Sequence, residues 1–222
     1  MDVTDEKRPV FEIILAEINR ERQDDRPFVI GINGIDGAGK TSLAALFERF
    51  LVSQGYKTQV IALDDFRNPQ AHRYAGDDRA DNYFNKSFAV ETIINELLIP
   101  IHRGGSFTTE LTLLDLNTDS YDIKKRFSFN SATLVIFEGV FLFRKELAPY
   151  IDFKIFLDIP FEESKKRALL RDSRLGQEGL KKYDEKYLPA QKKYLVEYPP
   201  ARVADLVIDN TDWQHPRVRT LG

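Results

Sequence analysis

The octapeptide GIDGAGKT, residues Gly34 to Thr41, is the most informative stretch of this 222-residue chain. It fits the pattern G-x-x-x-x-G-K-[ST] of a P-loop, in which successive backbone N–H groups point into one concavity and bind polyphosphate. Lys40 is expected to contact the β- and γ-phosphates, and the Thr41 hydroxyl is expected to bind Mg²⁺. The predicted nucleotide-binding residues are Gly34, Asp36, Gly37, Ala38, Gly39, Lys40, Thr41 and Ser42.

The segments on either side of the octapeptide match the context that a P-loop requires. The run FVIGIN, residues 28–33, is apolar enough for a buried parallel strand. After the loop, apolar side chains recur at helical spacing, at Leu43, Leu46, Phe47 and Phe50. Strand, glycine-rich loop and helix follow in the required order, which favours a phosphate-binding loop over an ordinary glycine-rich turn.

The rest of the chain alternates between strand and helix patterns. Apolar residues on one face predict a leading helix at residues 10–18. A second helix is expected over residues 88–98 with Ser87 as its N-cap, and a third begins near Pro160. The expected further strands cover residues 58–63, 133–137, 153–157 and 205–208.

This alternation predicts an α/β fold: a P-loop NTPase three-layer sandwich with a mostly parallel central sheet, helices on both faces and a small lid. Residues 1–26 are expected to hold a leading helix packed on the domain, and residues 27–222 the P-loop domain, with the lid at about residues 167–180. Two segments remain open: residues 67–86 are a loop or a short helical insert, and residues 111–122 are a strand or a loop.

Composition narrows the class of protein. The chain is 42% hydrophobic and 30% charged, which is ordinary for a globular protein, and its formal net charge of −3 gives no basic footprint for nucleic acid. Cysteine is absent, which excludes disulfides and agrees with a cytoplasmic location. No run approaches the ~20 apolar residues of a membrane span. Neither a nucleic acid nor a membrane is therefore expected as a partner, and a homo-oligomer remains possible.

Two acidic positions follow predicted strands, where ligands bind in open α/β sheets. Asp64, with Asp65 beside it, ends the second strand, and its carboxylate could accept a proton from a hydroxyl or orient Mg²⁺. Capping of a turn is the competing interpretation. Glu138 ends the apolar run TLVIF, which is the Walker B arrangement for Mg²⁺. Thr41, Glu138 and Asp64 are thus the predicted metal-binding residues.

The third predicted helix carries a group of arginines. Arg167 and Arg171 are four residues apart and hence share a face, and Arg174 follows shortly after. They could close over a transferring phosphoryl group, or they could form a solvated basic face. Farther on, Tyr183, Tyr187, Tyr194 and Tyr198 alternate with lysines, a pattern that favours a packed amphipathic helix over stacking on nucleic acid.

Five segments form an ordered set that is more specific than the P-loop alone. They are GIDGAGKTS, LDDF after the second strand, VIFEGVFLF, FLDIPFEESKKRALLRD and YPPARVADLVIDN. Together they resemble the uridine kinase and phosphoribulokinase family of P-loop kinases. The resemblance implies that Asp64 is the base for the 5′-hydroxyl of a nucleoside. It also implies that Arg167 and Arg171 belong to an arginine-bearing lid, and that the cofactors are ATP and Mg²⁺.

The chain departs from this family where uridine kinases read the base. Their Tyr-Asp-x-x-Thr-His-Ser segment corresponds here to residues 114–120, with Leu114 in place of Tyr and Asp119 in place of His. Leu cannot form a hydrogen bond, and a carboxylate only accepts one. A ribose-binding Asp of the family aligns with Asn85, which could still bond a diol. The predicted acceptor-binding residues are Asp64, Asn85, Asp119 and Arg167.

The leading hypothesis is an ATP- and Mg²⁺-dependent kinase that phosphorylates a hydroxyl of a small molecule, in the first instance a nucleoside or related riboside. Its predicted catalytic residues are Asp64, Lys40, Arg167 and Arg171. A P-loop switch or regulatory NTPase without a small-molecule acceptor is the alternative. The sequence leaves open the acceptor, the choice between ATP and GTP, and whether Asp64 acts as base or mainly as Mg²⁺ ligand.

Overall fold

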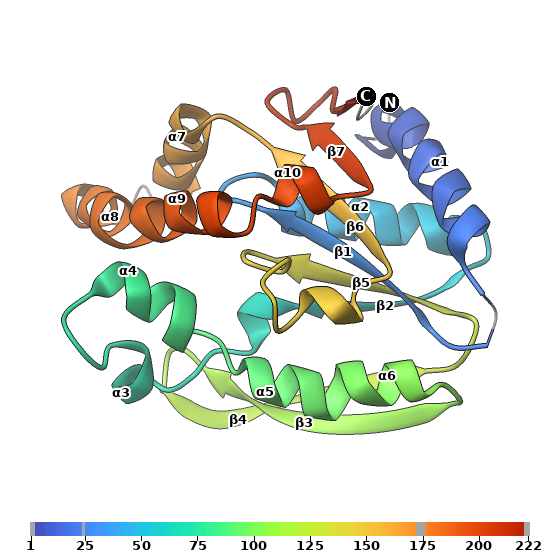
Figure 1. The fold of residues 1–222 in the computed structure, drawn as a ribbon, viewed down its shortest axis with the longest axis horizontal. Helices are drawn as coiled ribbons and strands as arrows, with labels where there is room; N and C mark the ends of the chain where they lie inside the picture. The colour runs from blue at the N-terminus through green and yellow to red at the C-terminus, as the bar shows by residue number, and fades with distance from the viewer. Residues whose placement is uncertain (1–2, 24, 172–175, 220–222) are drawn as a thin grey trace.

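The computed structural model describes residues 3–23, 25–171 and 176–219. Within these ranges, a central β-sheet has helices on both faces, and a long β-hairpin lies beside it (Figure 1). Among the described residues, no helix is long and apolar enough to cross a lipid bilayer.

The central sheet of the described chain has the strand order β2-β5-β1-β6-β7-β8. All neighbouring strands are parallel except β7 and β8, which are antiparallel. The strands are β1 Phe28–Gly34, β2 Lys57–Ala62, β5 Thr133–Gly139, β6 Phe153–Asp158, β7 Leu206–Asp209 and β8 Arg217–Arg219. The prediction of a mostly parallel α/β sheet is confirmed, and β8 is an antiparallel edge strand that the sequence analysis missed.

The helical segments follow the strands along the chain. They are α1 Val3–Glu21, α2 Lys40–Ser53, η1 Leu63–Asp65, α3 Gln70–Arg73, α4 Arg79–Asp81, η2 Asn82–Lys86, α5 Val90–Ile93, η3 Ile94–Leu98, α6 Ile99–Arg103, η4 Ala148–Tyr150, α7 Phe161–Arg171, α8 Gly176–Lys182, η6 Tyr183–Tyr187, α9 Leu188–Glu197 and α10 Pro200–Val203. The leading helix therefore extends beyond residues 10–18 at both ends. The segment 67–86, which sequence left open, contains three short helices.

Two apolar cores, one on each face of the sheet, hold the layers together. On one face, Phe11 of α1 and Phe47 of α2 lie with ring centroids 5.3 Å apart and pack in the same core as Ile30. On the other face, Val29 packs in a core with Tyr194 of α9. Neighbouring residues of β1 face opposite cores because side chains alternate along a strand. The predicted three-layer arrangement follows from this alternation.

The hairpin of β3 Phe107–Asp115 and β4 Ser120–Phe129 lies along α5 and α6 (Figure 1). Its strands are antiparallel, with a register shift between Leu113 and Leu114. Leu113 and Phe127 are buried in the core, whereas much of the opposite face is exposed. Residues 111–122, which sequence left undecided between strand and loop, thus form the end of this hairpin with its turn.

The expected N-cap at Ser87 is wrong. The helix begins at Val90, its N-cap position is Ala89, and no side chain caps it. The buried Ser87 hydroxyl instead donates to the carbonyl of Asn82 at 3.3 Å. Ser87 belongs to the turn before the helix, so its hydroxyl bonds a carbonyl of the preceding η2 and leaves the N–H groups of the following helix uncapped.

The parallel strands bring the predicted functional segments to one edge of the sheet. β1 ends at Gly34, where the P-loop begins, and β5 ends with Glu138 and Gly139. β2 is followed directly by η1, which contains Asp64. Since β5 lies between β1 and β2, the carboxyl ends of these three strands are neighbours.

Candidate active site

Side chains of neighbouring elements hold the P-loop by donating hydrogen bonds to its backbone carbonyls. The carbonyls of residues 36–38 accept hydrogen bonds from Ser164 Oγ at 2.5 Å, Arg167 Nη1 at 3.2 Å and Asn210 Nδ2 at 2.6 Å, respectively. Ser164 and Arg167 belong to α7, and Asn210 follows the end of β7. With its carbonyls committed to neighbouring elements, the loop can direct its N–H groups to an anion.

Two glycines of the loop need their missing side chains. Gly37 and Gly39 have φ values of 73° and 91°, in the left-handed region that Gly adopts without strain. A Cβ at Gly37 would lie 2.9 Å from the carbonyl oxygen of Ser164. Gly39 is also the N-cap of α2, and no side-chain hydrogen bond caps that helix. The start of α2 can therefore offer its N–H groups and its dipole to phosphate.

Lys40, Thr41 and Glu138 form the polar centre of the sheet edge. Lys40 is 9% exposed, and its ammonium donates to the carbonyl of Ile35 at 2.9 Å. The Thr41 hydroxyl donates to Glu138 Oε1 at 2.9 Å. Burial raises the pKa of the Glu138 carboxyl, although Lys40 and the Thr41 hydrogen bond act in the opposite direction. This carboxylate carries a desolvation cost that a cation would offset.

The donor set at this edge fits Mg²⁺. It offers the Thr41 hydroxyl and the Glu138 carboxylate, with Asp64 and Asp65 close enough to raise the pKa of Glu138. In the described part of the chain, no three or more His, Cys, Asp or Glu side chains are grouped as a metal cage. Mg²⁺ is commonly held by one or two carboxylates together with nucleotide phosphates, so a dedicated cage is not needed.

Asp64 and Asp65 have different surroundings although they are adjacent. Asp64 lines the cavity at the P-loop, its side chain is 66% exposed, and it forms an ion pair with Arg67. Asp65 pairs instead with Lys125 of β4 at 2.5 Å, which ties η1 to the hairpin. Of the two, only Asp64 lines the cavity among the described residues, and its role there stays a prediction.

Arg67 is a site residue that the sequence analysis missed. Besides its ion pair with Asp64, its guanidinium lies 4.4 Å from the ring centroid of Phe88. Burial acts against its charge, but Asp64, Tyr83 and Asp36 keep the pKa of Arg67 above its usual value. Arg67 is therefore a fixed cation that orients the Asp64 carboxylate.

A cavity of about 700 Å³ opens beside the P-loop. Six of the eight predicted nucleotide-binding residues line it, the exceptions being Gly34 and Ala38. Gly34 lies beneath the loop, where a Cβ would meet the carbonyl oxygen of Leu157 at 2.9 Å. The cavity also has apolar lining from Leu43, Leu46, Leu170 and Trp213. Its volume and mixed lining suit a nucleotide, with phosphates at the loop and an aromatic base against apolar side chains.

Asp36 joins the P-loop to the opposite side of the site. Its N–H donates to Gln191 Oε1 at 2.8 Å, and Gln191 Nε2 donates back to the Asp36 carboxylate at 2.7 Å. The hydroxyl of Tyr83 in η2 also donates to this carboxylate, at 3.3 Å. No sequence pattern marks Gln191 or Tyr83, because their contacts with Asp36 cross long sequence separations.

Arg167 lines the cavity, but its guanidinium is engaged by the protein. It donates to Glu163 at 2.8 Å and to the carbonyls of Gly37, Asn210 and Thr211 at 3.2, 3.0 and 2.7 Å. Arg167 thus fastens α7 to the P-loop and to the segment after β7. Arg174 and the side chain of Arg171 lie outside the described residues, as does part of the predicted lid.

The other two predicted acceptor residues do not line the 700 Å³ cavity. Asn85 is exposed and donates to Asp81 at 2.7 Å. The Asp119 carboxylate accepts from the N–H of Gln70 at 2.9 Å and from Arg73 at 3.3 Å. Asp119 therefore holds the start of α3 against the hairpin. Leu114, which stands where uridine kinases have Tyr, is 4% exposed and belongs to the apolar interior.

A P-loop, a hydrogen-bonded Thr41–Glu138 pair and Asp64 in the turn after β2 define a nucleotide site of the P-loop kinase class. The model of the Phosphoribulokinase / Uridine kinase family matches residues 29–214, and the chain belongs to this family. Kinases of this family generally use ATP with Mg²⁺, and family membership indicates a kinase that phosphorylates a small molecule.

Individual relatives agree with this assignment. The chain is 25% identical over 196 residues to a uridine kinase of Bacillus pumilus, covering 86% of this chain and 90% of that protein. It is 30% identical over 159 residues to a uridine kinase of Saccharomyces cerevisiae, covering 66% of this chain and 29% of the yeast protein. A solved structure described as a possible uridine kinase from Bacillus stearothermophilus has a TM-score of 0.70 at 26% identity, covering 93% of this chain and 99% of the other.

Proposed function

We propose that this protein transfers the γ-phosphoryl group of ATP to a hydroxyl group of a small molecule. The observation that carries the proposal is the meeting of Lys40, the Thr41–Glu138 pair and Asp64 at one sheet edge beside one cavity. Phosphoryl transfer needs positioning and charge neutralisation more than covalent chemistry, and these side chains supply both.

Each residue has a role that follows from its place. Lys40 and the loop N–H groups bind the phosphates, while Thr41 and Glu138 hold Mg²⁺, which neutralises charge as it develops on the phosphates. Asp64, oriented by Arg67, accepts the proton of the acceptor hydroxyl or orients that hydroxyl. Arg167 would act on the phosphoryl group only after leaving its contact with the P-loop backbone. A role for Arg171 at the phosphoryl group stays a prediction from the sequence.

A nucleoside or related riboside is the first acceptor class to test, because the similar proteins of Bacillus pumilus and Saccharomyces cerevisiae are uridine kinases. The two family positions that read the base carry Leu114 and Asp119 in this chain, and both side chains are engaged in the fold. We therefore expect uridine itself to be a poor acceptor compared with another riboside.

The matched pair Asp64→Asn and Asp65→Asn tests the role of the carboxylate. Asp64→Asn should lower acceptor-dependent ADP release by roughly 10²–10⁴-fold, the contribution of a general base. Asp65→Asn should remain within about threefold of wild type, since surface ion pairs such as Asp65–Lys125 contribute little. Full activity of Asp64→Asn would remove this residue from the chemistry.

ATP binding should be measured on the same variants. The protein has a single tryptophan, and Trp213 lines the nucleotide cavity, so its fluorescence should report binding directly. Both variants should bind ATP with unchanged affinity. ADP release that no acceptor stimulates would instead favour a switch or regulatory NTPase.

A further inference from the structure

Lys186 is a buried cation outside the nucleotide cavity. It lies in η6, it is 8% exposed, and its ammonium sits among three aromatic rings. The distances from Nζ to the ring centroids are 4.8 Å for Tyr74, 5.4 Å for Tyr83 and 5.3 Å for Tyr187. Lysines are almost never fully buried unless they are paired, so this position calls for an explanation.

No carboxylate of the described residues forms an ion pair with Lys186. Burial is the largest influence on Lys186 and lowers its pKa, and Arg67 and Arg73 act in the same direction. Tyr74 acts in the opposite direction, electrostatically and through a side-chain hydrogen bond. Aromatic rings attract an ammonium, but they do not supply a full negative charge. A desolvated cation on which two arginines also act still lacks such a counter-charge.

Lys186 lines a second cavity, of about 380 Å³, between the α3–α4 segment and the α8–η6 segment. The other residues of its lining are Tyr74, Arg79, Glu178, Lys181 and Lys182. The cavity is therefore rich in cations although the chain as a whole is acidic. Figure 1 shows α4 and α8 facing each other on this side of the molecule.

This second cavity lies next to the proposed reaction site. Tyr83 has its ring against the Lys186 ammonium and its hydroxyl on the Asp36 carboxylate of the P-loop. Arg67, whose charge reaches Lys186, is the ion-pair partner of Asp64. Tyr83 thus links Lys186 to Asp36, and the charge of Arg67 acts on Lys186 while Arg67 pairs with Asp64; both carboxylates line the nucleotide cavity.

We propose that the acceptor carries an anionic group, a carboxylate or a phosphate, that pairs with Lys186 in the second cavity while its hydroxyl lies at Asp64. The proposal rests on the phosphotransferase function proposed above and narrows its substrate class. A neutral nucleoside would leave Lys186 without a counter-charge, whereas a riboside or small polyol with an acidic substituent provides one. A charge-assisted hydrogen bond to a buried ammonium is both strong and selective.

The experiment compares acceptors that differ by one anionic group. The carboxylate pairs are orotidine with uridine and glycerate with glycerol, and the phosphate pair is ribose 5-phosphate with ribose. Binding to the enzyme saturated with ADP and Mg²⁺ is measured by calorimetry, and kcat/KM is measured by ADP release with ATP. The anionic member of at least one pair should bind about 10²-fold more tightly than its neutral partner, and the pair that responds distinguishes a carboxylate from a phosphate.

Variants assign the effect to Lys186. Lys186→Met should remove the preference for the anionic member and leave the neutral member unchanged, and Lys186→Arg should retain part of the preference because it keeps the charge. Lys193→Met, an exposed lysine on the neighbouring α9 that pairs with Glu197, should behave as wild type. Thermal unfolding of each variant checks that it folds, and Lys186→Arg carries the test should Lys186→Met fail to fold.

The outcomes separate the two proposals. A preference for anions in binding that Lys186→Met abolishes, without phosphoryl transfer to any acceptor, would support the anion site and contradict the kinase function. Phosphoryl transfer that is equal for the members of every pair, or a preference unaffected by Lys186→Met, would support the kinase function and overturn the anion site. Absence of a tenfold binding preference in all three pairs would overturn it as well.

Discussion

The donor side and the acceptor side of this molecule are built in different ways. On the donor side, the P-loop runs continuously from β1 into α2, and its carbonyls at residues 36–38 are fixed by α7 and the segment after β7. On the proposed acceptor side, Arg67 and Tyr74 come from one segment and Lys186 from another more than 100 residues later, and the Lys186 ammonium lies over the Tyr74 ring.

This difference shows what each side can change without loss of fold. A phosphate is recognised by backbone N–H groups and a helix dipole, which depend on glycine positions and hardly on other side chains. The proposed acceptor residues Asp64 and Lys186 lie in short helices near loops, where substitutions alter chemistry more than architecture. The family fold can therefore retain its donor site while the acceptor site acquires a new specificity.

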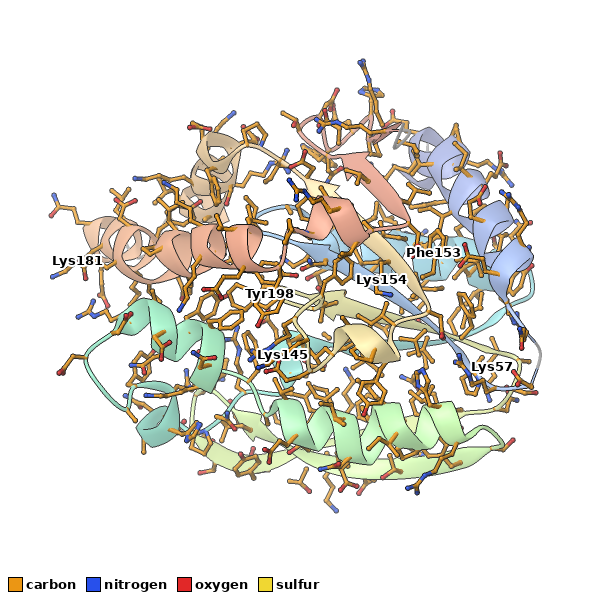
Figure 2. All side chains as sticks on the ribbon, in the orientation of Figure 1. Lys57, Lys145, Phe153, Lys154, Lys181 and Tyr198 are labelled. Carbon is orange, nitrogen blue, oxygen red and sulfur yellow. The ribbon has the colours of Figure 1, made fainter. Side chains whose placement is uncertain are left out.

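The largest expected effect comes from the donor side. Lys40→Met should lower turnover by roughly 10³-fold, because it removes the cation that stabilises charge on the transferring phosphoryl group. Steady-state kinetics with saturating acceptor would measure it. Lys57→Met is the control, since Lys57 lies at the start of β2, whereas the P-loop lies at the carboxyl ends of the parallel strands. Figure 2 shows Lys57 at the opposite end of the molecule from Lys181 of α8. Near-normal turnover of Lys40→Met would contradict a phosphate-binding role.

A smaller and differently distributed effect is expected on the acceptor side. Arg67→Met frees the Asp64 carboxylate from its ion pair, so kcat should fall by about tenfold while the KM for ATP stays unchanged, as expected for loss of orientation at the reacting group. The exposed Arg126 of β4 provides the matched control Arg126→Met. A rise of about tenfold in the KM for ATP would instead show that Arg67 acts on the donor side.

Stability should depend on the hydrogen bonds of Tyr194, which join β1 to α9. The Tyr194 hydroxyl accepts from Asn33 Nδ2 at 2.7 Å and from the N–H of Phe143 at 3.1 Å, both in buried surroundings. Tyr194→Phe leaves two donors without a partner and should lower the free energy of unfolding by about 2 kcal/mol. Chemical denaturation measures this change.

Tyr198→Phe is the control for that change, because the Tyr198 ring stacks on Tyr194 with centroids 5.8 Å apart while its hydroxyl forms no hydrogen bond within the described residues. We expect its unfolding free energy to stay within about 0.5 kcal/mol of wild type. Equal effects of the two substitutions would show that ring packing, rather than the hydroxyl, joins β1 to α9.

The smallest effect concerns the Glu138 carboxyl. Because its pKa is raised above 4.5 in the folded protein, its contribution to stability is complete below that value and is lost as pH rises through the raised pKa. Wild type should therefore lose stability relative to Glu138→Gln as pH increases from 4.5 toward neutrality, in protein free of nucleotide and Mg²⁺. Thermal unfolding of both proteins across this range provides the measurement, and a constant difference would contradict the raised pKa.

The segments of the proposed donor side could be located from the sequence for a physical reason. The P-loop is a contiguous motif, and Glu138 ends an apolar strand, so local patterns locate both. The acceptor side was harder because its contacts depend on the folded chain. Nothing in the sequence around Asp119 indicates that its carboxylate accepts the N–H of Gln70, and an Arg three residues after an Asp is too common to identify Arg67.

The same limit applies to Lys186 and Trp213. The lysine- and tyrosine-rich segment was correctly predicted as a packed helix, since Tyr183 and Tyr194 are buried, but helical periodicity does not show that Lys186 lies inside with them. Trp213 lies in the turn between β7 and β8, where no motif marks it, and only the fold brings it to the nucleotide cavity.

The most direct test of phosphotransfer is ³¹P NMR of the protein with ATP, Mg²⁺ and the acceptor that most strongly stimulates ADP release. We expect a new phosphate monoester resonance that grows in step with ADP, and we expect Asp64→Asn to slow this growth while still binding ATP. Formation of ADP with inorganic phosphate as the only other product would contradict transfer to an acceptor hydroxyl and leave a nucleotide hydrolase in its place.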